Sequence, residues 1–347
     1  MSVQRDPRDS MTSTWRKDRK QWTIFHYLID WLQLYGSNMD QDVPVFKKTD
    51  KMAWIPHIEQ HKWIVLHALW PFAVQQAYIS LYGKNWSPVF SFIFYNVAFT
   101  LNAVHQLHMM RGLGHIHGFL DGDVHGRDEI PDHSVGSVVR SLISTATFRP
   151  MMSVFLAYRT SQGPLTMSLW TPVEIGLYGI ILDFWFYWYH RCMHHFDGLW
   201  KFHRRHHLTK HPNPLLTLYA DTEQEIFDIA IIPLMTYLTL RFMGFPMGFY
   251  DWWLCHQYIV FTELWGHSGI RVYATPANPL ALFLRFFDAE LAIEDHDLHH
   301  RKGWKKSMNY GKQTLLWDRA FKTAGDRIET KPELVDYNSP ITLNVFG

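Results

Sequence analysis

Cysteine is almost absent from this sequence: the 347 residues include only Cys192 and Cys255. Two cysteines exclude a disulfide framework and every multi-cysteine zinc site. The chain also lacks an excess of either charge, with 33 lysines and arginines against 32 aspartates and glutamates. Proteins that bind nucleic acid usually carry a basic excess. The composition therefore argues against DNA or RNA as the main partner.

Several motifs that would assign the chain to a known chemistry are missing. No glutamate is followed by a histidine three positions later, so the Glu-x-x-His pairs of soluble carboxylate di-iron bundles are absent. The HExxH signature of zinc hydrolases is absent as well. Without a nucleotide fingerprint or a haem motif, any electrons that the protein needs must come from separate carriers. The polar, basic start of the chain has no apolar core, so we expect no cleavable signal peptide.

Long apolar runs rich in aromatic residues fill much of the chain. A membrane-spanning helix needs about 20 apolar residues. Runs near that length occupy 63–82, 86–104, 167–189, 226–243 and 246–265, with a less apolar run at 138–158. We therefore predict an all-α integral membrane bundle of four to six membrane helices, paired as hairpins around 83–85 and 244–246. The mean hydropathy of −0.16 leaves a soluble helical protein with a buried core as the alternative.

Polarity divides the chain into four regions. Residues 1–60 form a polar arm with an amphipathic piece at 22–34, and residues 61–160 hold the first membrane helices and a loop. Residues 165–325 form the predicted catalytic region, and residues 326–347 form a tail. The arm, the segment 201–210 and the segment 301–306 are basic. Because basic loops stay in the cytosol, we predict that both termini and a helical cap with the histidines face the cytosol.

The 22 histidines are the most informative residues, because nine of them fall in three short clusters. Each cluster has one histidine, two or three other residues, and then two adjacent histidines: His190, His194 and His195; His203, His206 and His207; His296, His299 and His300. Positions i, i+3 and i+4 share a helix face, so each cluster directs two or three imidazoles to one point. Imidazole suits iron, zinc and copper. Nine are more than one ion needs, so we predict two neighbouring ions, and an all-histidine site beside apolar helices favours iron.

The clusters and their flanks resemble the fatty acid hydroxylase/sterol desaturase superfamily, which includes sterol 4-methyl oxidases and sterol delta-5 desaturases. The similar flanks are the approach 183–191, the segment 266–269, Asn309-Tyr310-Gly311 and Trp317-Asp318. The resemblance implies that the clustered histidines and His267 bind two iron ions. It also implies that O2 is the oxidant and that electrons come from NAD(P)H through a b-type cytochrome, its reductase, or both.

Two positions depart from the sterol enzymes of this superfamily, which often carry histidine there. Asp221 stands in the stretch that matches their His-Pro-x-Glu/Asp, and Asp295 stands directly before the third cluster. A carboxylate can bind iron or orient a residue that does. Both aspartates are therefore candidates for either role, and the departures favour a specialised substrate.

Three further residues are candidates because of their place on predicted helices. Glu263 lies one helical turn before His267, as a metal ligand or as a partner of that imidazole. Asp183 lies two turns before His190, and a buried acid there is expected to accept a hydrogen bond from a metal-binding imidazole. His256 lies in an apolar helix and is a candidate for a place near the metals.

Together these features predict an oxidoreductase, a membrane non-haem di-iron oxygenase of the endoplasmic reticulum. It would use O2 and external electrons to hydroxylate an unactivated C–H bond of a sterol- or terpenoid-like lipid. Within the same superfamily, desaturation and aldehyde deformylation are the alternatives. Outside it, the alternatives are a non-catalytic sterol-binding protein and a metal-binding membrane transporter.

Overall fold

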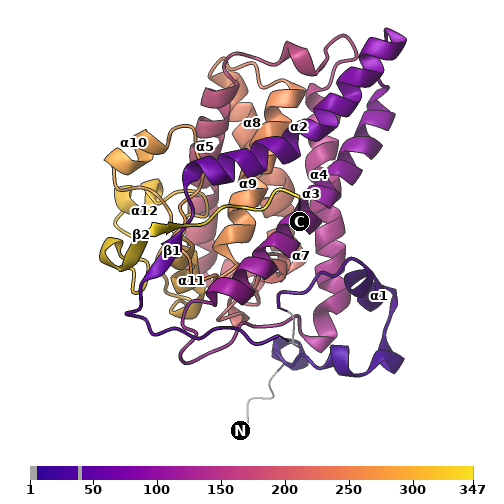
Figure 1. Ribbon diagram of the computed structural model, residues 1–347. Helices are drawn as coiled ribbons and strands as arrows, with labels where there is room; N and C mark the ends of the chain where they lie inside the picture. The colour runs from indigo at the N-terminus through magenta and orange to yellow at the C-terminus, as the bar shows by residue number, and fades with distance from the viewer. Residues whose placement is uncertain (1–5, 38–40, 347) are drawn as a thin grey trace.

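The computed structural model describes residues 6–37 and 41–346, and most of them are helical (Figure 1). This confirms the all-α prediction. The long helices are α2 (His57–Tyr82), α3 (Pro88–His117), α4 (Val135–Ala157), α5 (Thr171–His195) and α9 (Phe249–Gly266). They lie alongside one another (Figure 1).

The first predicted hairpin is present. α2 ends at Gly83, whose φ of 64° is left-handed, a conformation that glycine adopts without steric cost. α3 begins after Ser87, whose hydroxyl accepts a hydrogen bond from the Phe90 amide at 3.3 Å, with Pro88 as its first residue. These local signals turn the chain within the predicted residues 83–85.

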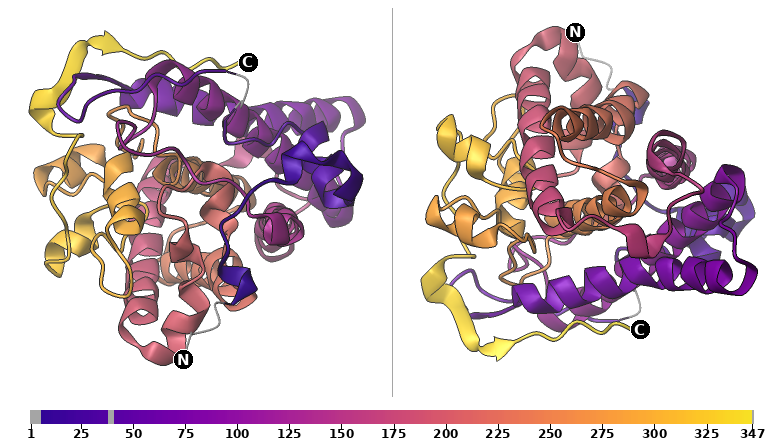
Figure 2. Two further views of the ribbon diagram at one scale, coloured as in Figure 1. Left: turned by 90° about the horizontal axis from the view of Figure 1, so that it is seen from below. Right: turned by 90° about the horizontal axis from the view of Figure 1, so that it is seen from above.

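Helix α9 is the centre of the fold, because it packs against α2, α3, α4, α5 and α11 (Ile293–Arg301). Nearly all of its residues are buried, among them Trp252, Trp253 and Phe261. The two views of Figure 2 show the other long helices arranged around it. An apolar helix without a polar face is stable only in such surroundings.

The apolar run predicted at 226–243 is divided in the structure. It begins as α7 (Thr222–Ile226), continues through one π-helical turn (Phe227–Ile231), and ends as α8 (Ile232–Phe242). The second predicted hairpin follows, with Gly244 at a left-handed φ of 91° before α9. Single π-helical turns are frequent at functional sites, and this one lies directly after residues that contact a histidine cluster.

The grouped histidines lie at the end of the long helices where α6 (Asp197–His203) and α11 are found, joined by loops and short 3-10 turns. The short helices α10 (Ala281–Phe286) and α12 (Leu316–Ala320) lie beside α5 instead, where Leu280 approaches Gly176 and Trp317 donates to Ile180 O at 2.9 Å. A parallel pair of strands, β1 (Met52–Trp54) and β2 (Val335–Pro340), ties the arm to the tail. The sequence did not predict this pair. The amphipathic piece at 22–34 contains α1 (Ile24–Trp31), which packs against α4.

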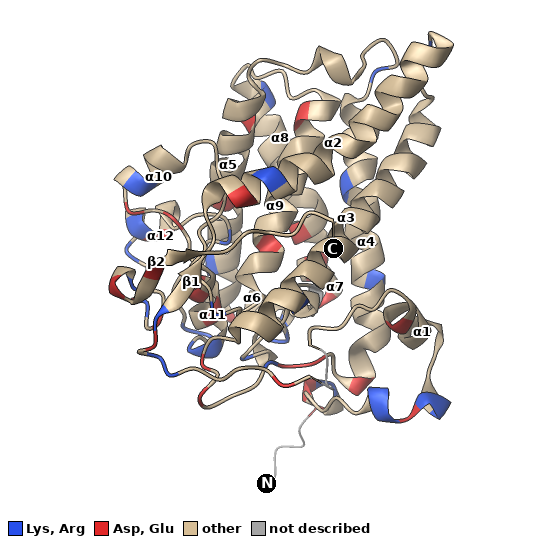
Figure 3. Ribbon diagram, in the orientation of Figure 1, with Lys and Arg blue, Asp and Glu red and all other residues tan. Residues whose placement is uncertain are grey.

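Membrane character is supported more weakly than helicity. Among the described residues, α2 is the one helix whose length and hydropathy suffice to cross a membrane. The count of four to six membrane helices therefore stays a prediction. Charged residues concentrate at the end that holds α1 and α11 and are sparse along the opposite halves of the long helices (Figure 3).

Candidate metal centre

Five histidines from three helices and one turn converge on the first of two points. His190 and His194 come from α5, His203 from the end of α6, His207 from a 3-10 turn and His299 from α11. All five are buried, and one ring nitrogen of each lies within 4.8 Å of the others. Neighbouring Nε2 atoms are 2.9–3.0 Å apart, in the pairs His190–His203, His194–His203, His203–His207 and His207–His299.

The outward-facing nitrogens show which way these imidazoles are protonated. Four of the five Nδ1 atoms lie at hydrogen-bond distance from an oxygen that only accepts: Tyr310 O for His190 (2.7 Å), Trp304 O for His194 (2.9 Å), Met308 O for His299 (2.6 Å) and Gln224 Oε1 for His203 (2.8 Å). The Nδ1 atom must therefore carry the hydrogen. A neutral imidazole has a single N–H, so the Nε2 lone pairs of these four rings face inward.

A second group of four buried histidines lies beside the first: His206, His267, His296 and His300. Three of them repeat the same arrangement, with Nδ1 donating to a main-chain carbonyl: Tyr219 O for His206 (3.2 Å), Glu263 O for His267 (2.9 Å) and Thr209 O for His300 (3.0 Å). The Nε2 atoms of His267 and His296 are 3.0 Å apart. The rings of His207 and His300 stack at 4.9 Å between centroids, so the two groups adjoin.

Convergent lone pairs repel one another unless a cation lies between them. Protonation does not supply that cation, because burial and the neighbouring imidazoles hold the pKa of His203, His207 and His299 well below the ordinary value. Neutral imidazole is the form that binds metal ions, and it suits iron, zinc and copper. The nine residues therefore fit two metal ions, five ligands facing one and four facing the other.

The three main-chain carbonyls that orient His190, His194 and His299 come from one loop, 304–310, which follows the third cluster. Asp318 holds this loop, since its buried carboxylate accepts the amides of Tyr310 and Gly311, each at 2.8 Å. Asp183 holds the next three residues, accepting the amides of Lys312 (2.7 Å), Gln313 (3.0 Å) and Thr314 (3.2 Å) and the Thr314 hydroxyl (2.8 Å). The prediction that Asp183 bonds directly to an imidazole is therefore wrong, and it acts through the loop instead.

The other carboxylate candidates lie in ion pairs, outside both histidine groups. Asp221 pairs with Arg205, and Asp295 pairs with Arg327 and accepts the Ala292 amide at the start of α11. Glu263 pairs with Arg149 at 2.8 Å and with Lys312 at 3.1 Å. The predicted link from Glu263 to His267 exists, but through the main-chain carbonyl of Glu263 rather than its side chain.

Two histidine candidates are not brought to the groups. His195 is exposed at the end of α5 and belongs to neither group. His256 is buried in α9 but lies near Ser153 and Tyr178, at 3.3 and 3.4 Å. Sequence reasoning missed Gln224, Trp304 and Met308, because a carbonyl or amide that orients a ligand leaves no signature of its own.

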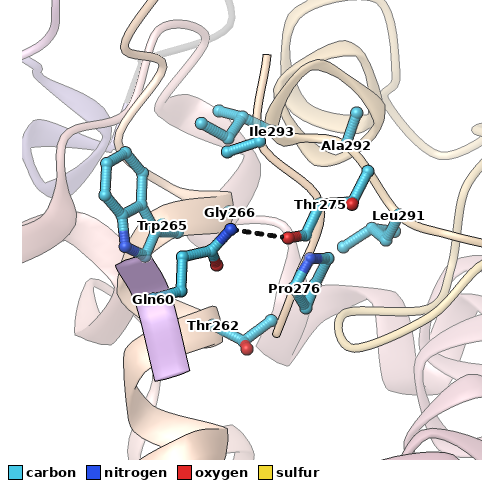
Figure 4. Close-up of a pocket in the computed structure, with 10 residues that line it drawn as sticks. Gln60, Thr262, Trp265, Gly266, Thr275, Pro276, Leu291, Ala292 and Ile293 are labelled. Carbon is cyan, nitrogen blue, oxygen red and sulfur yellow. Dashed lines mark hydrogen bonds between the residues drawn. The ribbon is translucent and has the colours of Figure 1, made fainter. Parts of the chain in front are cut away.

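A small cavity lies beside the second group, between α9 and the segment before α11 (Figure 4). It measures 20 Å³ and is lined by Thr262, Trp265, Gly266 and Ile293 among others. The amide of Gln60 closes one side by donating to Thr275 O at 2.9 Å. This volume admits about one water molecule, so it does not admit a lipid chain.

Comparison with known proteins agrees with this geometry. The fatty acid hydroxylase family profile matches residues 175–323, which contain all nine grouped histidines. A fatty acid hydroxylase from a Lecanicillium species is 44% identical over 305 residues, 84% of this chain and 83% of the relative. The chain belongs to the fatty acid hydroxylase family. This membership confirms the predicted recognition and makes the protein an oxidoreductase.

More distant fatty acid hydroxylase relatives carry out different reactions by name. A very-long-chain aldehyde decarbonylase of Oryza sativa is 28% identical over 59% of this chain and 74% of its own length. A methylsterol monooxygenase of Arabidopsis thaliana is 27% identical over 67% of this chain and 86% of its own length. No solved structure matches the chain. The relatives' names thus point to lipids as the class of substrate and leave the reaction open.

Proposed function

We propose that this fatty acid hydroxylase family member is a membrane-embedded di-iron monooxygenase that hydroxylates a C–H bond of a lipid. The observation that carries the proposal is the convergence of nine neutral imidazoles in two adjoining groups, seven of them oriented by an oxygen on the outer side. Iron bound there would supply oxygen activation. The ligands would be His190, His194, His203, His207 and His299 for one ion, and His206, His267, His296 and His300 for the other.

The chain itself would contribute three things to this chemistry. Hydrogen bonds to carbonyls fix the ring orientations and raise the basicity of the imidazoles. Burial of the whole site excludes bulk water. Apolar surface on the long helices, including Leu66, Val97 and Phe155, would keep the protein in the bilayer where a lipid substrate dissolves.

Electrons would come from an external carrier that docks near the histidines. Of the basic residues in the predicted cytosolic loops, Arg204, Arg205 and Lys305 pair with acids of the chain itself. Lys201, Lys302 and Lys306 are exposed and lie two, two and six positions from the nearest grouped histidine in the sequence. We propose these three lysines as the docking surface for an acidic b-type cytochrome or reductase that draws on NAD(P)H, on the cytosolic face of the endoplasmic reticulum.

The first test of the proposal is the metal content of the purified protein. Elemental analysis of detergent-purified protein should find about two iron ions per chain, and a His203→Ala/His299→Ala variant should lose them. Stoichiometric zinc would call for reconstitution with ferrous iron before any assay. Absence of metal from the wild type would overturn the proposal.

Product analysis then separates hydroxylation from the reaction named for the rice relatives. The iron-loaded protein would receive a reductase, a b-type cytochrome, NADPH and O2 with fatty acids, methylsterols or long-chain aldehydes. A product that gains one oxygen atom from ¹⁸O2 supports hydroxylation. An aldehyde that loses its carbonyl carbon supports aldehyde deformylation instead.

A further inference from the structure

Three charged side chains are buried together among the long helices, outside the histidine groups. Arg149 lies in the middle of α4, Glu263 lies in α9, and Lys312 lies in the loop before α12. Their exposed fractions are 2%, 8% and 8%. Glu263 receives both cations, with Arg149 Nη2 at 2.8 Å and Lys312 Nζ at 3.1 Å. One carboxylate thus pairs with two positive charges.

The guanidinium of Arg149 is only partly satisfied by this pairing. Its Nε and Nη1 atoms are buried and have no hydrogen-bond partner among the described residues. Buried donors are almost always paired, and an unpaired one is destabilising. Asp228 Oδ1 and Tyr189 Oη are likewise buried without a partner, and Asp228 lies within electrostatic reach of Arg149 and Lys312. These atoms are suited to a polar group that comes from outside the chain.

A folding role alone does not explain an arginine at this place. Ionisable residues within apolar helices are costly, and where they occur they usually mark a functional site. Glu263 contacts only one of the three nitrogens of this guanidinium, Nη2, among the described residues. The guanidinium therefore offers more hydrogen-bonding capacity than its protein neighbours use.

The cluster lies next to the second histidine group. Glu263 O accepts the Nδ1 hydrogen of His267 at 2.9 Å, and the two residues lie four positions apart, about 6 Å of helical rise. Lys312 follows Tyr310, the residue that orients His190, by two positions. The ammonium of Lys312 lies over the ring of Phe186 at 4.0 Å, so apolar surface adjoins the charges. A chain held here by a polar end would have its nearby carbons beside the metal centre.

We propose that Arg149 is the anchor for the oxygen-bearing end of the lipid substrate. Its free Nε and Nη1 donate to a carboxyl or hydroxyl oxygen, Lys312 and Glu263 hold the guanidinium in place, and the hydrocarbon extends past the histidine groups. The anchor explains how an oxygenase could select one carbon of a uniform chain. This inference rests on the proposed function, since it assigns a substrate end to the same site.

Binding of three probes to the iron-loaded protein under nitrogen tests the anchor without turnover. The probes are radiolabelled hexadecanoic acid, 1-hexadecanol and n-hexadecane, which share a chain and differ in the oxygen. We expect wild type to bind the acid or the alcohol at least tenfold more tightly than the hydrocarbon. Arg149→Lys, which keeps one nitrogen to pair with Glu263 and loses the free donors, should remove that preference and leave hexadecane binding unchanged.

Arg140→Lys is the matched control, since Arg140 lies on the same helix, is exposed, and donates to Ser137 rather than to the buried charges. It should keep the wild-type preference. Iron content and melting temperature of each variant show whether the fold and the metal site persist. Equal binding of all three probes by wild type, or an unchanged preference in Arg149→Lys, would overturn the anchor. Absence of iron and of oxygen-dependent turnover in wild type would overturn the proposed function instead, while the binding preference would still report on Arg149.

Discussion

Replacing Asp183 with asparagine should weaken metal binding although Asp183 is not near a ring nitrogen. The carboxylate is fully buried and accepts four hydrogen bonds from residues 312–314, two at each oxygen. These residues directly continue the loop whose Met308 and Tyr310 carbonyls orient His299 and His190. The substitution therefore tests whether the hydrogen bonds of Asp183 to the loop are needed to hold the imidazoles in position.

The magnitude follows from the bonds that asparagine cannot make. It keeps one acceptor oxygen and presents an NH2 group, which faces N–H donors, at the other. Two bonds are lost if the NH2 group faces the Lys312 and Gln313 amides, and one is lost if it faces Thr314, because the Thr314 hydroxyl can accept from it. A hydrogen bond to a charged group contributes about 1.5–3 kcal/mol, so the variant should lose about 1.5–6 kcal/mol of unfolding free energy. Substitutions of residues that orient metal ligands typically reduce metal affinity about 10–100-fold, and we expect a loss in that range.

Two measurements and one control variant make this prediction decisive. Chelator competition gives the metal affinity, and thermal melting with and without metal gives the stability. Asp326→Asn, at an exposed carboxylate, should change neither. A lower melting temperature with unchanged metal affinity would refute the reasoning, because the loop would then stabilise the fold without orienting the imidazoles.

Three more outcomes follow from the site. His203→Ala should reduce the bound metal because its Nε2 faces three other ring nitrogens, whereas exposed His195→Ala should leave the metal content unchanged; elemental analysis compares them. Burial and the nearby His267 lower the pKa of His206 to about 3 from 6.5. As the pH falls below 6.5, His206 becomes protonated in the unfolded chain but not in the folded protein. The free energy of unfolding of the metal-free protein should therefore fall by about 1.4 kcal/mol per pH unit from His206 alone. Melting temperatures that stay constant from pH 7 to pH 5 would contradict this reasoning. Glu263→Gln should retain the full metal content but lose about 3–5 kcal/mol of stability by breaking a buried pair with Arg149; a loss of one metal ion would instead make Glu263 a ligand.

Much of the architecture could be predicted because it depends on local signals. Apolar runs of helical length and a glycine at each turn located the hairpins around 83–85 and 244–246. Spacing on a helix likewise predicted that His190 and His194, four positions apart, face one point. The π-helical turn at Phe227–Ile231 and the pairing of β1 with β2 could not be predicted this way, since packing and contacts between distant segments decide them.

The sequence by itself determined which residues could bind metal, and the tertiary structure decided how they divide. Eight of the nine clustered histidines, together with His267, form groups of five and four, and His206 and His207, adjacent in a 3-10 turn, project into different groups. His195 was left out because it lies one residue, about 100° of helix rotation, beyond His194. The sequence could not decide the roles of Glu263, Asp221 and Asp295, because a carboxylate can bind a metal ion or form an ion pair with an arginine. Only the fold pairs Glu263 with Arg149, Asp221 with Arg205 and Asp295 with Arg327. Nothing in the sequence indicates these pairs.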